Sequence, residues 1–90
     1  RETAFKVMAR RNKLLGLWVA EYLGLEGKGA EVYAREVVQA DFERPGDEDV
    51  FEKIWNDLKD RNIELSEERV RQKMTELLHE AEKQFADLKV

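Results

Sequence analysis

The sequence predicts an all-α protein, a single four-helix bundle whose first and last helices are the longest. Apolar residues recur at spacings of three and four along four segments, which is the period of an amphipathic helix. Glycine, proline or capping residues separate each segment from the next. The only proline is Pro45, so no helix interior is interrupted by one. A chain of 90 residues forms one domain with one modest core.

The first two helices are expected over about residues 2–23 and 28–43. Gly24 is a plausible terminator of the first, because glycine readily adopts the left-handed conformation that ends helices. One face of the first helix carries Phe5, Met8, Asn12, Leu15, Val19 and Tyr22. The stripe of the second consists of Ala30, Tyr33, Ala34, Val37 and Ala40. Its small residues would permit close approach by a neighbouring helix.

The third and fourth helices are expected over about residues 47–61 and 67–88. Asp47 and Ser66 are the predicted caps, since short polar side chains satisfy the exposed N–H groups of a first turn. Acidic residues after each cap suit the positive end of the helix dipole. The third helix presents Phe51, Ile54, Trp55 and Leu58. The fourth presents Val70, Met74, Leu77, Leu78, Ala81, Phe85 and Leu88, the most regular stripe in the chain.

Short connections between these helices favour antiparallel neighbours. At 1.5 Å per residue the outer two helices would measure about 33 Å and the middle two about 23 Å. The start of the first helix and the end of the last would then lie at the same end of the bundle and extend beyond the core. That end is a natural place for contact with a partner. We expect the protein to be a monomer.

The composition excludes several functional classes. The chain has no cysteine, so disulfides, thiolate nucleophiles and cysteine-based zinc sites are excluded. No apolar run approaches the roughly 18 residues that a membrane-spanning helix needs, and we expect a cytoplasmic protein. Residues 1–13 carry a charge of +4, yet the whole chain has a net charge of −4. An acidic surface argues against nucleic-acid binding, which depends on neutralising phosphates.

We expect no catalytic machinery, and therefore not an enzyme. His79 is the only histidine, so a histidine triad or a histidine metal cluster cannot form. No glycine-rich phosphate loop of the usual spacing is present. The acidic stretch over residues 41–49 lacks the ligand spacing of a calcium loop. Its carboxylates are better explained by the start of the third helix, and no metal site is predicted.

The candidate binding residues form one basic cluster, Arg10, Arg11, Asn12 and Lys13. One interpretation is ionic pairing across the first hairpin, with Arg10 or Arg11 meeting Asp41 or Glu43. The other is an anion or nucleotide site, because guanidinium groups bind phosphate oxygens well. From chemistry alone we favour pairing. Trp18 is expected to pack in the core, although its ring could also serve as a platform for adenine.

Three stretches resemble a known family. They are ARRNKLLGLW at residues 9–18, ADFERPGDEDV at 40–50 and MTELL at 74–78. Together they resemble the zeta subunit of alphaproteobacterial F-type ATP synthases, the ATPase inhibitor subunit zeta family. The resemblance extends over essentially all 90 residues, in order and with similar spacing. ARRNKLLGLW is the specific motif, whereas the stretch in the fourth helix alone would not identify the family.

The resemblance implies a four-helix fold, binding to the catalytic head of the synthase, restraint of ATP hydrolysis and weak binding of ADP or ATP. It implies a cytoplasmic protein that is peripheral to the inner membrane through the synthase. It also favours the nucleotide interpretation of residues 10–13, with Trp18 and Asp41 as further candidates. Family chains usually carry a mobile stretch before the residue that matches Arg1, and inhibition is placed there. We expect the chain without that stretch to bind the synthase head poorly and to inhibit ATP hydrolysis weakly or not at all.

A second functional class remains open. The chain could be a stand-alone nucleotide-sensing or adaptor module that never meets the synthase. Co-purification with synthase subunits separates the two possibilities.

Overall fold

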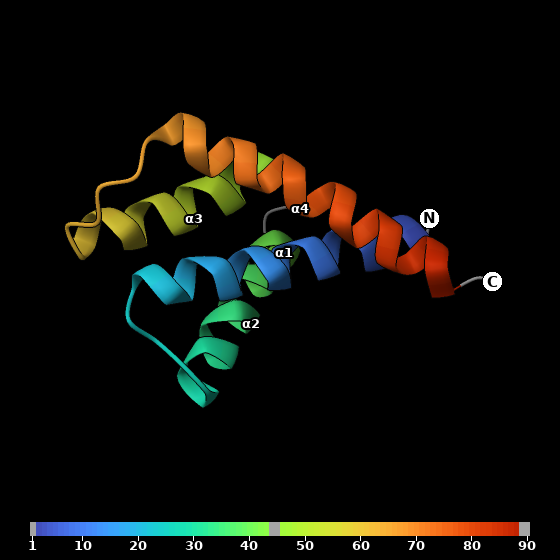
Figure 1. Ribbon diagram of the computed structural model, residues 1–90, viewed down its shortest axis with the longest axis horizontal. Coiled ribbons are helices and arrows are strands. Elements are labelled where there is room, and N and C mark those ends of the chain that lie inside the picture. Colours follow the sequence, from blue (N-terminus) through green and yellow to red (C-terminus); the bar gives the residue numbers. More distant parts are fainter. Residues whose placement is uncertain (1, 44–45, 89–90) are drawn as a thin grey trace.

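The structure, a computed structural model, describes residues 2–43 and 46–88, and these residues form four helices without a strand. The side chains of residues 2, 43, 87 and 88 are not described. The helices are α1 (Glu2–Tyr22), α2 (Lys28–Glu43), α3 (Asp47–Asp60) and α4 (Glu67–Leu88) (Figure 1). The predicted all-α fold with a long first and a long last helix is confirmed. The first and third helices each end one residue before the predicted boundary.

α1 is the central helix, and it contacts each of the other three. In Figure 1, α4 lies along one side of α1 and α2 lies on the other. The start of α1 and the end of α4 lie at the same end of the molecule, as predicted from the helix lengths. The molecule is elongated, with extents of 43, 27 and 23 Å. The start of α1 and the end of α4 lie together at one end of its long axis (Figure 1).

Two helices end in the same way, in the left-handed termination known as the Schellman motif. After α1, Gly24 has a φ of 77°, and the N–H of Leu25 donates to the carbonyl of Ala20 at 2.9 Å. After α3, Asn62 takes the left-handed role with a φ of 59°, and the Ile63 N–H donates to the last turn at 2.9 Å. Leu25 and Ile63 then pack against the core, so each motif directs the chain back to the bundle.

α1 and α2 cross in close contact at Gly16. A Cβ atom at Gly16 would lie 2.6 Å from the Cα of Ala34, which is far inside contact distance. The absence of a side chain at Gly16 therefore sets the spacing of the two helices. The prediction that small residues of the second helix permit close approach is confirmed at Ala34. Its counterpart Gly16 was not singled out from the sequence.

The core fills the space between α1 and the other helices, and most of its members belong to the predicted apolar stripes. Two residues of the first stripe are exposed instead, Phe5 at 55% and Tyr22 at 42%. Its buried members are Leu15, Val19, Ala20, Leu23, Tyr33, Val37, Val50, Phe51, Ile54, Leu58, Val70 and Met74. Between α3 and α4 the main polar link is Arg71, whose guanidinium donates to both carboxylate oxygens of Glu48 at 2.8 and 3.1 Å. The same group lies 4.0 Å from the ring centre of Phe51.

One predicted cap is confirmed and the other is wrong. The hydroxyl of Ser66 accepts a hydrogen bond from the Arg69 N–H at 3.0 Å, as a cap at the start of α4 should. At the start of α3 the cap position belongs to Gly46, and no side chain caps the helix there. Asp47 instead lies in the first turn, where its carboxylate accepts a hydrogen bond from Arg11. The guanidinium of Arg11 is buried and needs an anionic partner, whereas the free N–H groups at the start of α3 can be hydrogen-bonded by water.

Candidate functional site

The four residues of the basic cluster point in different directions, because successive residues of a helix are rotated by about 100°. Arg10 points towards α4, where its Nη1 donates to the side-chain oxygen of Gln84 at 2.8 Å. Lys13 lies on the opposite side, beside a shallow cavity between α1 and α2 that Glu31 and Arg35 also line. Arg10 and Lys13 are exposed, and neither has a carboxylate partner among the described residues. The cluster is therefore not one convergent site.

Arg11 is a buried structural cation with only 1% of its surface exposed. Its Nη2 donates to Oδ1 of Asp47 at 2.7 Å, and its Nε donates to Oδ1 of Asn12 at 2.8 Å. The pairing interpretation thus holds in kind for Arg11, but its partner Asp47 is in α3 and is not the expected Asp41. The side chain of Glu43, the other expected partner, lies outside the described residues. The pair joins the middle of α1 to the first turn of α3.

Asn12 is fully buried and is oriented by Arg11. Its Oδ1 is identified as the acceptor because an Arg11 N–H points at it. Its Nδ2 is therefore the donor, and it has no hydrogen-bond partner among the described residues. Buried amide groups without a partner are uncommon in folded proteins and call for an explanation.

Asn12 lines a cavity of about 150 Å³ between α1 and α2, which we call the α1–α2 cavity. Its other lining residues are Phe5, Ala9, Val38, Asp41 and Phe42. Asp41 accepts a hydrogen bond from the Gly46 N–H through its Oδ1 at 3.2 Å, which ties the end of α2 to the start of α3. Of the six candidate residues from the sequence, Asn12 and Asp41 are the two that line this cavity.

Phe5 and Phe42 both line the same cavity, and their rings contact each other. Their ring centres are 5.2 Å apart and the rings are tilted by 60°. They are 55% and 54% exposed, which is unusual for phenylalanine. Sequence reasoning placed Phe5 on the buried stripe and did not single out Phe42. The available signal was the position of Phe5 two turns before Asn12, on the same face of the helix.

Trp18 lies away from this cavity, on the side of α1 that faces α4. Its ring meets Tyr22 edge to face at 5.1 Å, and Arg69 and Lys73 lie 5.7 and 5.8 Å from its centre. It also packs against the core, in agreement with the packing role favoured from the sequence. The structure therefore separates Trp18 from Asn12 and Asp41.

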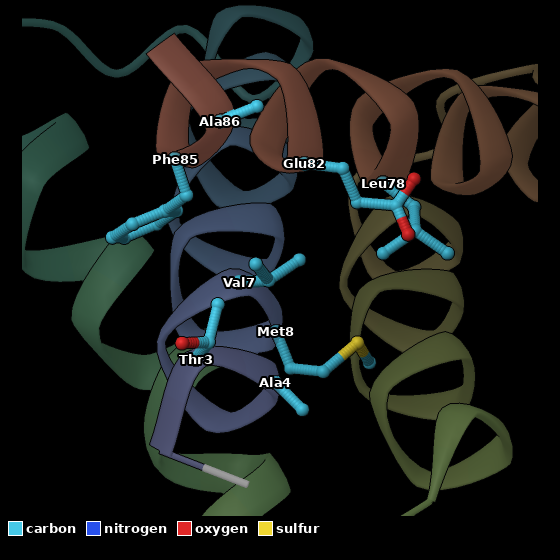
Figure 2. Close-up of a pocket in the computed structure, with 8 residues that line it drawn as sticks. All are labelled: Thr3, Ala4, Val7, Met8, Leu78, Glu82, Phe85 and Ala86. Atoms are coloured by element: carbon cyan, nitrogen blue, oxygen red, sulfur yellow. The ribbon is translucent and has the colours of Figure 1, made fainter. Parts of the chain in front are cut away.

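A larger and mostly apolar groove of about 610 Å³ lies where the start of α1 meets the end of α4. Figure 2 shows the side chains of Leu78 and Phe85 on α4 and those of Val7 and Met8 on α1, which line the groove together. Of the described residues that line it, only Glu82 is charged. The groove occupies the end of the molecule that was predicted to extend beyond the core.

The comparison with protein families gives a match along nearly the whole chain. The model of the family described as ATPase inhibitor subunit zeta matches residues 1–84. The chain belongs to this family. A structure solved by solution NMR is 51% identical in sequence and superposes with a TM-score of 0.80. The match covers 92% of this chain and 94% of that one. A comparison with curated proteins found no match.

Membership of an ATPase inhibitor family suggests a regulatory protein. None of the described residues form a group of three or more histidine, cysteine or acidic side chains able to hold a metal ion. Within the same residues, no helix is long and apolar enough to cross a membrane. His79 is exposed on α4, as the sequence suggested.

A network of titrating groups with raised pKa values lies between α2 and α3. The Tyr33 hydroxyl donates to Oδ2 of Asp57 at 2.7 Å, and Lys53 lies 2.9 Å from the same oxygen. Burial, followed by the bond to Asp57, raises the pKa of Tyr33 far above its usual range. Burial opposes the charge on Lys53, but hydrogen bonds to Asp57 and Glu36 outweigh it and raise its pKa. These groups hold α2 against α3.

Proposed function

We propose that this protein binds the catalytic head of a bacterial F-type ATP synthase and restrains its hydrolysis of ATP. The observation that carries the proposal is the family match over residues 1–84. In this role the protein would be peripheral to the inner membrane, held there through the synthase.

The proposal includes weak binding of ADP or ATP near the first helix. Arg10 and Lys13 are exposed cations without a described carboxylate partner, so each is available to phosphate oxygens. Arg11 is already bound to Asp47 and to Asn12, and would act by orienting Asn12. Arg10 faces α4 and Lys13 faces α2, so the two would not bind the same phosphate. Trp18 faces Arg69 and Lys73 of α4 and would not contact a nucleotide bound at Lys13.

Binding to the synthase is tested with the cognate catalytic head. The protein is added in increasing amounts to the purified head, complex formation is followed by size exclusion, and hydrolysis of ATP is assayed in the same samples. We expect a weak complex and a small, concentration-dependent fall in hydrolysis. A protein that forms no complex but still binds ATP would instead be a stand-alone nucleotide-sensing module, and the proposed function would be wrong.

A further inference from the structure

Two helices alone line the groove of about 610 Å³ at the start of α1 and the end of α4, which we call the α1–α4 groove. Its residues lie between positions 3 and 8 of α1 and between positions 78 and 86 of α4. Val7 is buried, whereas Ala4 and Ala86 on facing helices are exposed and small (Figure 2). Small side chains allow another helix to approach closely, as Ala34 does where α1 crosses α2. The groove therefore has room for a third helix.

The α1–α4 groove begins where α3 stops covering the two helices. The first turn of α3 is joined to α1 at Arg11 and to α4 at Arg71. Arg11 lies one turn after Val7, and Arg71 lies two turns before Leu78, so each arginine shares a helix face with the groove. In Figure 1, α1 and α4 extend past the start of α3 towards the two chain ends. The groove is the uncovered continuation of the surface against which α3 packs.

The length of the groove fits a short helical segment. Its residues on α4 extend from Leu78 to Ala86, which is about 12 Å along the axis, or roughly two turns of an opposing helix. An amphipathic helix presents apolar residues at spacings of three and four, and it binds in apolar grooves of this kind. A helix placed there would continue the path of α3 and pack on both α1 and α4.

The charge of the groove indicates what such a helix must carry. Glu82 is the charged residue among those that line the groove, it is exposed, and no described residue forms an ion pair with it. The nearby carboxylates of Asp47 and Glu48, at the start of α3, are already paired with arginines. A carboxylate that a partner covers without supplying a cation loses its hydration and destabilises the complex. The groove therefore favours an apolar helix face that carries lysine or arginine.

We propose that the α1–α4 groove binds an amphipathic helix of the synthase catalytic head. Apolar residues of that helix pack on Val7, Met8 and Leu78, and a lysine or arginine pairs with Glu82. The head as the source of the helix rests on the proposed function, whereas the helical shape and the cation follow from the groove. A contact two turns long is small, and it accounts for a weak complex between the head and this bundle.

Oxidation of the two methionines reports whether the groove is covered. Met8 lines the groove and is partly exposed, whereas Met74 is in the core and 5% exposed, and the chain has no other methionine. The unaltered protein is treated with hydrogen peroxide, alone and with an excess of the purified cognate head, and the sulfoxide at each position is measured by mass spectrometry. The head should slow oxidation of Met8 by about fivefold or more and leave Met74 unchanged, since access governs the reaction.

The matched variants are Glu82→Lys and Glu80→Lys. Both carboxylates are exposed on α4 and both variants change the net charge equally, but Glu80 does not line the groove. It points to another side of the helix, where it accepts a hydrogen bond from Gln84. Glu82→Lys should weaken binding of the head by about tenfold, because the cation of the partner then meets a like charge. Glu80→Lys should bind as the unaltered protein does. Titration calorimetry measures the affinities, and circular dichroism checks that both variants are folded.

Four results would overturn the inference. If the head forms a complex while Met8 is oxidised as fast as before, the head contacts another face, and the proposed function still stands. If Glu82→Lys binds the head as well as Glu80→Lys does, the partner places no cation at Glu82. If Met8 becomes protected when the protein alone is concentrated, the groove is filled by a second copy of this chain. If the head forms no complex and leaves Met8 unprotected, the inference fails together with the head-binding part of the proposed function.

Discussion

Nη2 of Arg11 in α1 lies 2.7 Å from Oδ1 of Asp47 in the first turn of α3. The two ends of this pair have different surroundings, because the Arg11 side chain is 1% exposed and that of Asp47 is 56% exposed. Removing the carboxylate leaves a guanidinium buried without an anion, whereas removing the guanidinium leaves a carboxylate that water can solvate. The pair should therefore respond unequally to loss of either member.

The first prediction follows from this asymmetry. Asp47→Ala should lower the free energy of unfolding by about 3 kcal/mol, the lower end of the range for a buried charge left unpaired. Arg11→Met should cost only about 1–2 kcal/mol, mainly because Asn12 Oδ1 loses its donor. Urea unfolding followed by circular dichroism measures both. Glu52→Ala, an exposed change in the same helix, is the control. A larger cost for Arg11→Met would contradict the argument.

The second prediction concerns the crossing of α1 and α2. Gly16→Ala should lower the free energy of unfolding by about 1–3 kcal/mol, because its new methyl group would meet backbone of Ala34 and the helices must separate. Gly29→Ala is the matched control, since Gly29 lies in α2 and its added Cβ would have its nearest neighbour at 3.8 Å. That change should be neutral or stabilising by up to about 1 kcal/mol. Equal effects at the two positions would show that the close crossing does not matter.

The third prediction concerns alkaline pH. The pKa values of Tyr33 and Lys53 are both raised on folding above their ordinary values of 10.0 and 10.5, so the folded state holds these protons more tightly than the unfolded chain does. Their contribution to stability is fully present below about pH 10 and is lost as the pH rises above it. In Tyr33→Phe the free energy of unfolding should fall less steeply as the pH rises. Unfolding free energies measured between about pH 8 and pH 11 would show it, and an unchanged slope would remove Tyr33 as a cause.

The helices were predictable because their signals are local. The apolar stripes, the glycine after α1 and the serine before α4 each act within a few residues of the structure they determine. The misplaced cap at Asp47 has a non-local cause, since its competing partner Arg11 lies 36 residues away in sequence. The same limit hid the role of Gly16, because a glycine inside a helix gives no sign of which neighbour approaches it.

The candidate site was predicted less completely for the same physical reason. Successive residues of a helix point in different directions. Arg10 therefore faces α4, Arg11 faces the first turn of α3, and Lys13 faces α2. Asn12 was correctly placed on a buried stripe, but the absence of a partner for its Nδ2 is visible only in three dimensions. The pairing of Phe5 with Phe42 depends on how the two helices cross, which no local pattern specifies.

The last prediction separates the candidate nucleotide residues by position. Lys13→Glu should weaken ATP binding by about fivefold to tenfold, because it replaces an exposed cation with an anion where phosphates are proposed to lie. Adenosine binding should hardly change, and the loss for ATP should shrink as salt screens the charges. Trp18→Phe is the comparison within the same helix, and it should leave both affinities unaltered because Trp18 faces Arg69 and Lys73 on α4. Titration calorimetry at low and high salt measures these affinities. Reversing the charge of Arg11 would not test the nucleotide site. The variant would lose the ion pair with Asp47 and be destabilised, and its unfolding could not be distinguished from a loss of nucleotide binding. If Trp18→Phe weakened ATP and Lys13→Glu did not, the nucleotide would lie on the α4 side of α1, and the assignment to the α2 side would be wrong.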